Sequence, residues 1–153
     1  MPVFHEHQAI FFHIGKTAGV AIERGLGLEA CDYREYQPER VYGVNKGVMT
    51  QHARPSYVRQ LIDADVWNNY FKFTIVRNPW DRMVSAYYYL YNINKEKYGD
   101  FGSWLIVMHD QVVNKTYRES SHVTPQIEYT HEDGEQIMDY VGKYENLAES
   151  YQY

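Results

Sequence analysis

The stretch Ala9-Ile-Phe-Phe-His-Ile14 and the residues that follow it, Gly15-Lys-Thr-Ala-Gly19, decide the expected fold. The first part is a nearly continuous apolar run of strand length. A run without alternation is typical of a strand that is buried on both faces. The glycines permit a tight turn, and residues 20–26 then form a short helix that Gly27 ends. The order predicts a buried strand, a turn and a helix.

The same order occurs a second time further along the chain. Residues 70–76 are rich in aromatic and β-branched side chains, and Pro79 is suited to the first turn of a helix. Apolar residues at helical spacing predict that this helix covers residues 80–91. The remaining expected elements are a third strand at 137–144, helices at 56–62, at 101–113 and from Leu147, and irregular segments at 43–50 and 115–125. Strands alternating with helices predict a parallel α/β sheet with right-handed crossovers.

Length and composition limit the class of protein. The 153 residues suit one domain, residues 1–153, and 44% apolar with 23% charged residues excludes a disordered or fibrous chain. Because no apolar run approaches about 18 residues and the amino terminus lacks a signal-peptide pattern, we expect a soluble, cytoplasmic protein without a membrane partner. Cys31 is the single cysteine, so an intrachain disulfide and a Cys-rich metal site are excluded. The histidines show no metal-ligand spacing either.

The net charge of −5 is unevenly distributed. The acidic surplus lies in residues 118–153, where a solvated face explains it, and residues 1–117 are close to neutral. A nucleic-acid partner is disfavoured, because such a surface needs clustered Lys and Arg and a basic domain. Any site for an anionic ligand must therefore be local.

The first candidate anion site is the turn at residues 15–19. Small residues allow a tight backbone turn with amides directed outward, and Lys16 adds a full positive charge. The turn resembles the end of a Walker A loop, but the glycine that this motif needs five residues before Gly15 is replaced by Ile10. An ordinary nucleotide triphosphatase is therefore disfavoured. The alternative is a plain strand-to-helix turn with an exposed lysine.

The second candidate anion site follows the second strand. Arg77 lies at the strand end and Ser85 on the next helix, and a planar guanidinium with a hydroxyl can hold a phosphate. The alternative is that Arg77 pairs with Asp81 and that Ser85 is a neutral helical residue. In parallel sheets, ligands bind beyond the carboxyl ends of the strands, where both sites are expected. A ligand with two separated anionic groups would use both.

These stretches resemble a known family. Ile10-Phe-Phe-His-Ile-Gly-Lys-Thr-Ala-Gly19 resembles the 5′-phosphosulfate-binding loop of sulfotransferases that use 3′-phosphoadenosine 5′-phosphosulfate (PAPS), particularly the carbohydrate-type branch. Phe73-Thr-Ile-Val-Arg-Asn-Pro-Trp-Asp-Arg-Met-Val-Ser-Ala-Tyr87 is similar to the family's 3′-phosphate-binding segment, and Val141-Gly-Lys-Tyr-Glu-Asn-Leu147 resembles a later element. The resemblance implies a three-layer, P-loop-like α/β fold with PAPS as donor. It assigns donor binding to Gly15, Lys16, Thr17, Ala18, Gly19, Val20, Arg77 and Ser85.

The resemblance also implies the reaction. The sulfuryl group of PAPS would pass to an acceptor hydroxyl, with a carbohydrate as the expected acceptor, and adenosine 3′,5′-bisphosphate (PAP) would leave. Lys16 would neutralise the leaving oxygen, and no metal is needed. His52 is the first candidate for the base, because it falls between the two anion sites and some members of the branch use a histidine from this region. An exposed loop histidine is the alternative. The other candidates for the base are His13, Glu23, Glu145 and His122.

Two rival functions stay open. One is a small kinase that uses the Gly15–Thr17 turn. The other is a degenerate or truncated module that binds PAP or PAPS without turnover. The family's loop often has proline at the position of Gly15, and often Thr and Ser at the positions of Val20 and Ala21, and family members usually continue beyond Tyr153. The chain is therefore expected to be short for a complete sulfotransferase, with a homo-oligomer as one way to complete the acceptor site.

Overall fold

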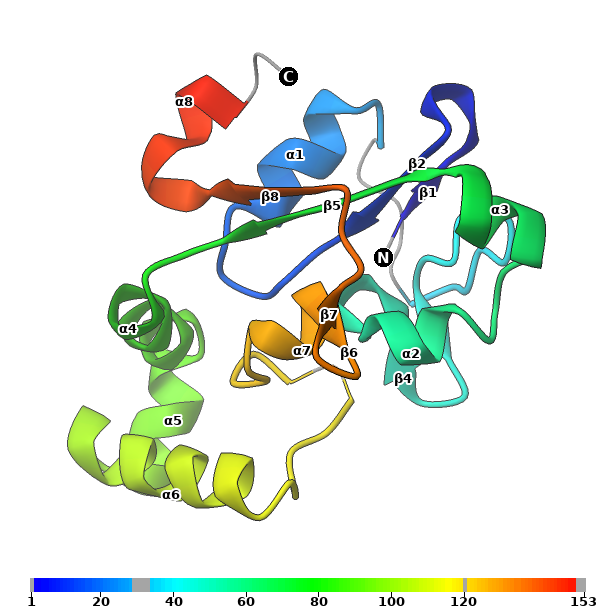
Figure 1. The fold of residues 1–153 in the computed structure, drawn as a ribbon. Helices are drawn as coiled ribbons and strands as arrows, with labels where there is room; N and C mark the ends of the chain where they lie inside the picture. The colour runs from blue at the N-terminus through cyan, green and yellow to red at the C-terminus, as the bar shows by residue number, and fades with distance from the viewer. Residues whose placement is uncertain (1, 29–33, 120, 151–153) are drawn as a thin grey trace.

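A four-stranded sheet forms the centre of the fold (Figure 1). The computed structural model describes residues 2–28, 34–119 and 121–150, so Cys31 lies outside the described residues. The strand order is β1 (Val3–Phe4), β2 (Ala9–Phe12), β5 (Phe71–Val76) and β8 (Tyr140–Lys143). The last three strands are parallel, which confirms the expected α/β sheet, and β1 adds an antiparallel edge.

Both faces of β2 are covered, as its unbroken apolar run predicts. Ile10 and Phe12 are fully buried on one face, against a cluster that includes α2 (Pro55–Val58) and α3 (Ala64–Asn69). Phe11 is fully buried on the other face, against α1 (Gly19–Gly25) and α8 (Leu147–Ser150). Figure 1 shows the helices in these two layers on either side of the sheet.

A helical unit follows β5 beyond its carboxyl end. It consists of α4 (Pro79–Tyr89), α5 (Tyr91–Tyr98) and α6 (Phe101–Val113), which pack around Tyr87, Trp104 and Met108. The helix expected at 101–113 is confirmed, and the Asp100 side chain caps it by accepting from the Ser103 N–H. The helix expected at 80–91 is interrupted at Leu90, whose backbone leaves the helical region, so the chain turns into the unpredicted α5.

Other elements are shorter than expected or were not expected. The helix expected at 56–62 ends as α2 at Val58, because the next turn tightens through bonds from the N–H groups of Gln60 and Leu61 to residues three positions earlier. The strand expected at 137–144 is paired only at 140–143. Besides β1, α3 and α5, the unpredicted elements are η1 (His5–His7), the hairpins β3 (Val44–Asn45) with β4 (Val48–Met49) and β6 (His131–Glu132) with β7 (Glu135–Gln136), α7 (Ile127–Thr130), η2 (Thr50–His52) and η3 (Tyr144–Asn146). Across the described ranges, no helix is both long and apolar enough to cross a membrane.

Candidate functional site

The loop between β2 and α1 presents its backbone at the carboxyl end of the sheet. Lys16 and Ala18 adopt left-handed conformations, with φ of 71° and 67°. The N–H groups of Lys16, Ala18 and Gly19 have no backbone acceptor among the residues that the structure describes. The Thr17 hydroxyl is fully buried and donates to the carbonyl of Ile14 at 2.8 Å. The loop therefore offers amides and the Lys16 ammonium to a ligand, while the Thr17 side chain closes the turn.

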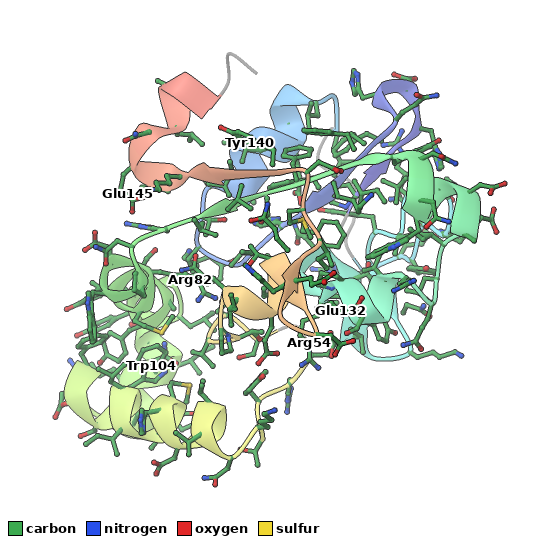
Figure 2. All side chains as sticks on the ribbon, viewed as in Figure 1. Arg54, Arg82, Trp104, Glu132, Tyr140 and Glu145 are labelled. Atoms are coloured by element: carbon green, nitrogen blue, oxygen red, sulfur yellow. The ribbon has the colours of Figure 1, made fainter. Side chains whose placement is uncertain are left out.

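Arg82 anchors this loop from α4. Figure 2 shows Arg82 in the space between α4 and the loop. Its Nε donates to the carbonyl of Gly15 at 3.0 Å, and its Nη2 donates to the carbonyls of His122 and Thr124 at 2.7 and 3.0 Å. The side chain is buried, and burial lowers the pKa of Arg82 to about 10. Arg82 thus joins the loop to the segment that carries His122.

Arg77 reaches the same loop from the end of β5. Its Nη1 donates to the carbonyl of Lys16 at 3.3 Å, and its guanidinium lies 4.3 Å from the centre of the Tyr144 ring. The Nε of Arg77 is buried without a partner. Gln126 holds the Arg77 backbone by accepting from its N–H and donating to its carbonyl. Within the described part of the chain, Arg77 forms no ion pair with Asp81. Its bond to the carbonyl of Lys16 brings the two expected anion-binding stretches into contact.

Lys16 rests on an aromatic side chain of α4. Its Nζ lies 3.8 Å from the centre of the Tyr89 ring, and burial together with the nearby Arg77 lowers the pKa of Lys16. Ser85 is half-buried on α4, three residues after Arg82 and four before Tyr89. Residues at this spacing share one face of a helix, so Ser85 lies on the face that Arg82 and Tyr89 direct at the loop.

His13, one of the candidate bases, is a hydrogen-bonded core residue. Its Nδ1 lies 2.7 Å from Oε1 of Glu23, and the side-chain amide of Gln51 donates to the other carboxyl oxygen of Glu23. Burial lowers the pKa of His13 and raises that of Glu23, so the buried pair is favoured in its neutral state. Glu145, another candidate base, is exposed and accepts from the Asn78 N–H at 2.6 Å.

His52 is buried in η2, so its interpretation as an exposed loop histidine is wrong. Its Nδ1 lies 3.0 Å from the carbonyl of His13. A carbonyl only accepts, so Nδ1 carries the proton and Nε2 of the neutral ring is left as an acceptor. Burial lowers the pKa of His52 well below its ordinary value. Two residues later, Arg54 binds Glu119 and Glu128, which fixes this segment against these two side chains.

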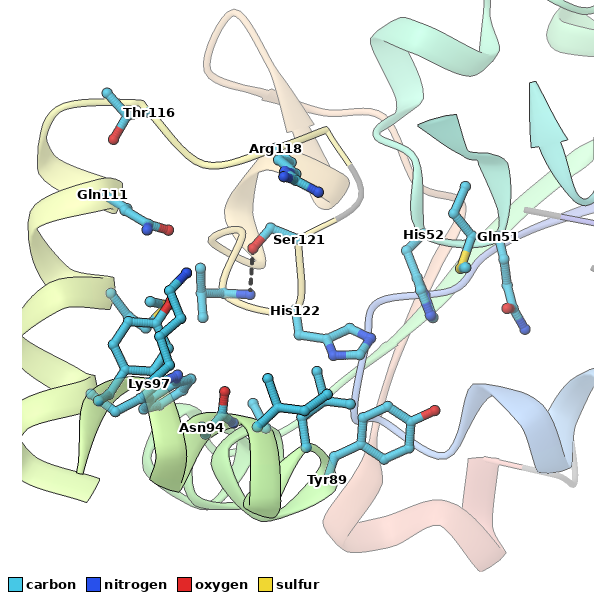
Figure 3. A pocket seen from close by; sticks show the side chains of 18 residues that line it. Gln51, His52, Tyr89, Asn94, Lys97, Gln111, Thr116, Arg118, Ser121 and His122 are labelled. Carbon is cyan, nitrogen blue, oxygen red and sulfur yellow. Dashed lines mark hydrogen bonds between the residues drawn. The ribbon is translucent and has the colours of Figure 1, made fainter. Parts of the chain in front are cut away.

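A cavity of about 810 Å³ lies beside the loop and the histidines (Figure 3). His52, His122 and Tyr89 line one part of it, and the rings of His52 and His122 are 5.1 Å apart and edge-to-face. Lys97 and Arg118 line another part, and the described lining residues include no carboxylate. The site therefore combines an anion-binding loop with a basic, histidine-lined space large enough for a sugar-sized molecule.

Sequence reasoning missed part of this arrangement. Arg82 lies within the quoted segment 73–87, only five residues after Arg77, but nothing in the sequence shows that it reaches back to Gly15. Tyr89 is one of several consecutive tyrosines and has no distinguishing signal. Tyr129 donates to the carbonyl of His52 at 2.7 Å across 77 positions, and no local pattern indicates this bond.

Comparison with known protein families identifies the family of the chain. The family model of the sulfotransferase family matches residues 1–153, which is the whole chain. No curated protein and no solved structure gives a significant match. The central sheet with its parallel strands and flanking helices is consistent with the fold of this family. The chain belongs to the sulfotransferase family, and it is therefore a transferase.

Proposed function

We propose that the protein transfers the sulfuryl group of PAPS to a hydroxyl of a carbohydrate acceptor and releases PAP. The observation that supports this most is the meeting of Lys16, Arg77 and Arg82 at one loop. None of the three forms an ion pair with a carboxylate in the described ranges. Like charges held together without counter-ions favour a ligand that brings several negative charges.

The residues at the loop fit such a donor. The buried Nε of Arg77 lacks a partner, and leaving a buried donor unsatisfied costs roughly 1–3 kcal/mol. A phosphate oxygen would satisfy it, and Ser85 faces the same loop from α4. We assign the 3′-phosphate to Arg77 and Ser85, and the 5′-phosphosulfate to Lys16 and the backbone of Gly15, Thr17, Ala18, Gly19 and Val20. When bound, PAPS supplies a sulfuryl group whose transfer leaves an electron pair on a phosphate oxygen of PAP.

His52 and Lys16 have separate tasks in this proposal. The Nε2 of His52 accepts the proton of the acceptor hydroxyl, because its Nδ1–H is already donated to the carbonyl of His13. The Lys16 ammonium, which is held at the loop, neutralises the charge on the leaving oxygen. The acceptor lies in the cavity, since His52 lines it on the side nearest the loop.

Transfer of radiolabelled sulfate from PAPS to a panel of glycans tests the proposal. We expect a labelled product with at least one glycan and none with the His52→Ala variant. Val20 and Ala21 are exposed and bring no hydroxyl to the loop, so a module that binds the donor without turnover is the relevant second candidate. PAPS binding without any product would support that candidate and contradict the proposed reaction.

A thermal-shift measurement separates the donor from a nucleoside triphosphate. PAP without magnesium should raise the melting temperature, because a ligand at 100 times its Kd stabilises the native state by about 2.7 kcal/mol. The matched control is Arg77→Ala, which should show a smaller shift. A shift with ATP and magnesium, but none with saturating PAP, would support the kinase instead.

A further inference from the structure

The imidazole of His122 packs directly on Gly15 of the donor loop. A Cβ atom on Gly15 would lie 2.5 Å from Cδ2 and 3.4 Å from Nε2 of His122. The backbone of Gly15 is outside the left-handed region, so an L-residue here would meet the histidine ring, which would have to move, and not a strained backbone. Gly15 therefore makes room for an imidazole whose Cδ2–Nε2 edge lies at the loop.

His122 lies between this loop and the cavity. Its ring is edge-to-face with the rings of His52 and Tyr89, at 5.1 and 5.4 Å, and it lines the cavity. Figure 3 shows the ring directed toward His52, with Tyr89 beside it. Among the described residues, neither ring nitrogen of His122 has a hydrogen-bond partner, whereas its carbonyl is held by Arg82. The nitrogens are thus available to a ligand at the junction of loop and cavity.

The surroundings of His122 favour the role of a hydrogen-bond donor over that of a catalytic base. Burial lowers the pKa of His122 to about 4, and the charges of Lys16 on the loop and of Arg82 on α4 add to this effect. The ring is therefore neutral at pH 7 and carries one N–H. A base in this position would have to become an imidazolium beside two cations, whereas a hydrogen-bond donor stays neutral. His52 already donates its N–H to the carbonyl of His13, so only its acceptor nitrogen, Nε2, is left for a substrate. The ring of His122 still has its N–H to donate.

We propose that His122 donates a hydrogen bond to an oxygen of the sulfuryl group during transfer, while His52 accepts the proton of the acceptor. This inference rests on the proposed function of the site. A donor that is already positioned needs no reorganisation as the reaction proceeds. The room for the ring comes from Gly15, where the family's loop often has proline.

Two substitutions at His122 test the donor role in catalysis. His122→Phe keeps a ring but removes the N–H, and it should lower kcat by about 100-fold. His122→Gln keeps an N–H donor at similar reach, so it should restore kcat to within about 10-fold of the wild type. The acid limb of the pH profile of kcat should stay unchanged in His122→Gln. Equal losses in both variants, with a displaced acid limb, would assign the base to His122 and overturn the proposal. His109→Gln, on the exposed surface of α6, is the control.

Donor binding gives a readout that does not depend on turnover. PAP lacks the sulfuryl group, so His122→Phe should weaken PAPS binding by roughly 5-fold more than PAP binding. An unchanged ratio of the two Kd values contradicts the role of His122 alone. A wild-type protein that binds neither PAPS nor PAP contradicts the proposed function as well, so the two failures are distinguishable.

A double-mutant cycle tests the pairing of Gly15 with His122. Gly15→Ala should displace the imidazole and reduce the preference for PAPS over PAP about as much as His122→Phe does. In a His122→Ala background, which removes the ring, Gly15→Ala should change this preference by less than about 2-fold. Additive effects of the two substitutions would contradict the pairing, and melting curves confirm that each variant is folded.

Discussion

The loop proposed to bind the donor and the cavity proposed to bind the acceptor lie side by side but are held in different ways. The loop at residues 15–19 is fixed by two arginines that donate to its carbonyls and by the internal bond of Thr17. The far part of the cavity is lined by exposed side chains such as Lys97, Arg118 and Ile93. A rigid backbone site suits a ligand that is always the same, and exposed side chains suit an acceptor that differs between proteins.

Two histidines, His52 and His122, lie between the loop and the far part of the cavity. His52 is fixed by its bonds to the backbone of His13 and from Tyr129, and His122 is fixed through Arg82. We therefore expect substitutions in the loop to lower the activity toward every acceptor equally. Substitutions in the far part of the cavity should lower the activity toward some acceptors more than toward others.

The largest expected effect is that of Lys16→Ala on turnover. Removing a charge that stabilises the transition state should lower kcat by roughly 100- to 1,000-fold. The Kd of PAPS should rise only a few-fold, because Arg77 and the loop amides remain. Single-turnover kinetics beside a PAPS titration measures both quantities. A larger loss in affinity than in kcat would mean that Lys16 binds the donor and does not act on the leaving group.

Arg82→Leu should damage stability as well as activity. It leaves three carbonyls in or beside the loop without their donor, and we expect a loss of about 3 kcal/mol in the free energy of unfolding. Urea denaturation measures the loss, and Arg59→Leu on the exposed surface is the matched control. Normal stability with full activity would show that the loop and the His122 segment do not need this link.

Arg77→Ala should act mainly on donor affinity. Losing the guanidinium contacts to one phosphate should raise the Kd of PAP by roughly 10- to 100-fold, while kcat at saturating PAPS falls less than for Lys16→Ala. Isothermal titration calorimetry with PAP measures the change. If Arg77→Ala reduces kcat more than affinity, the assignments of the two anion-binding side chains must be exchanged.

Stability should fall as the pH is lowered from about 6.5 toward 4. The pKa values of His13, His52 and His122 are lowered by burial, so the unfolded chain binds more protons in this range. The stability that depends on these histidines is fully present at a pH above their pKa in the unfolded chain. It is lost as the pH falls toward their lower pKa values in the folded protein. The raised pKa of Glu23 acts in the opposite direction and offsets part of the loss. His122→Gln should flatten the slope by up to about 1.4 kcal/mol per pH unit, measured by urea denaturation. An unchanged slope would contradict a neutral, buried His122.

The smallest expected effect is that of Arg118→Ala in the far part of the cavity. It should raise the acceptor KM by roughly 2- to 5-fold for an acidic glycan, because exposed ionic contacts contribute at most about 1 kcal/mol. The Kd of PAP should not change. An altered PAP affinity would show that the loop and the cavity are not separate binding regions.

The sequence predicted the elements around the loop at residues 15–19 better than the elements around the cavity. The order of strand, turn and helix after Ala9 and again after Phe71 depends on local signals, namely apolar runs, Gly15, Gly19 and Pro79. The division at Leu90 and the helix α5 were not predicted, because tyrosine-rich helical periodicity continues across the break. Residues at that break and on α5 line the cavity, so the sequence did not predict the cavity.

By itself the sequence determined the buried parallel strands, the glycine turn and the two cationic side chains that follow them, because each depends on residues close together in the chain. Only the tertiary structure decided that Arg77 and Arg82 bind one loop across 61 and 67 positions. It also decided that His13 is a core residue while His52 and His122 face the cavity. The physical reason is the parallel pairing of β2 with β5, with Phe12 opposite Thr74, which brings the ends of two distant strands to one edge. No local pattern contains that register.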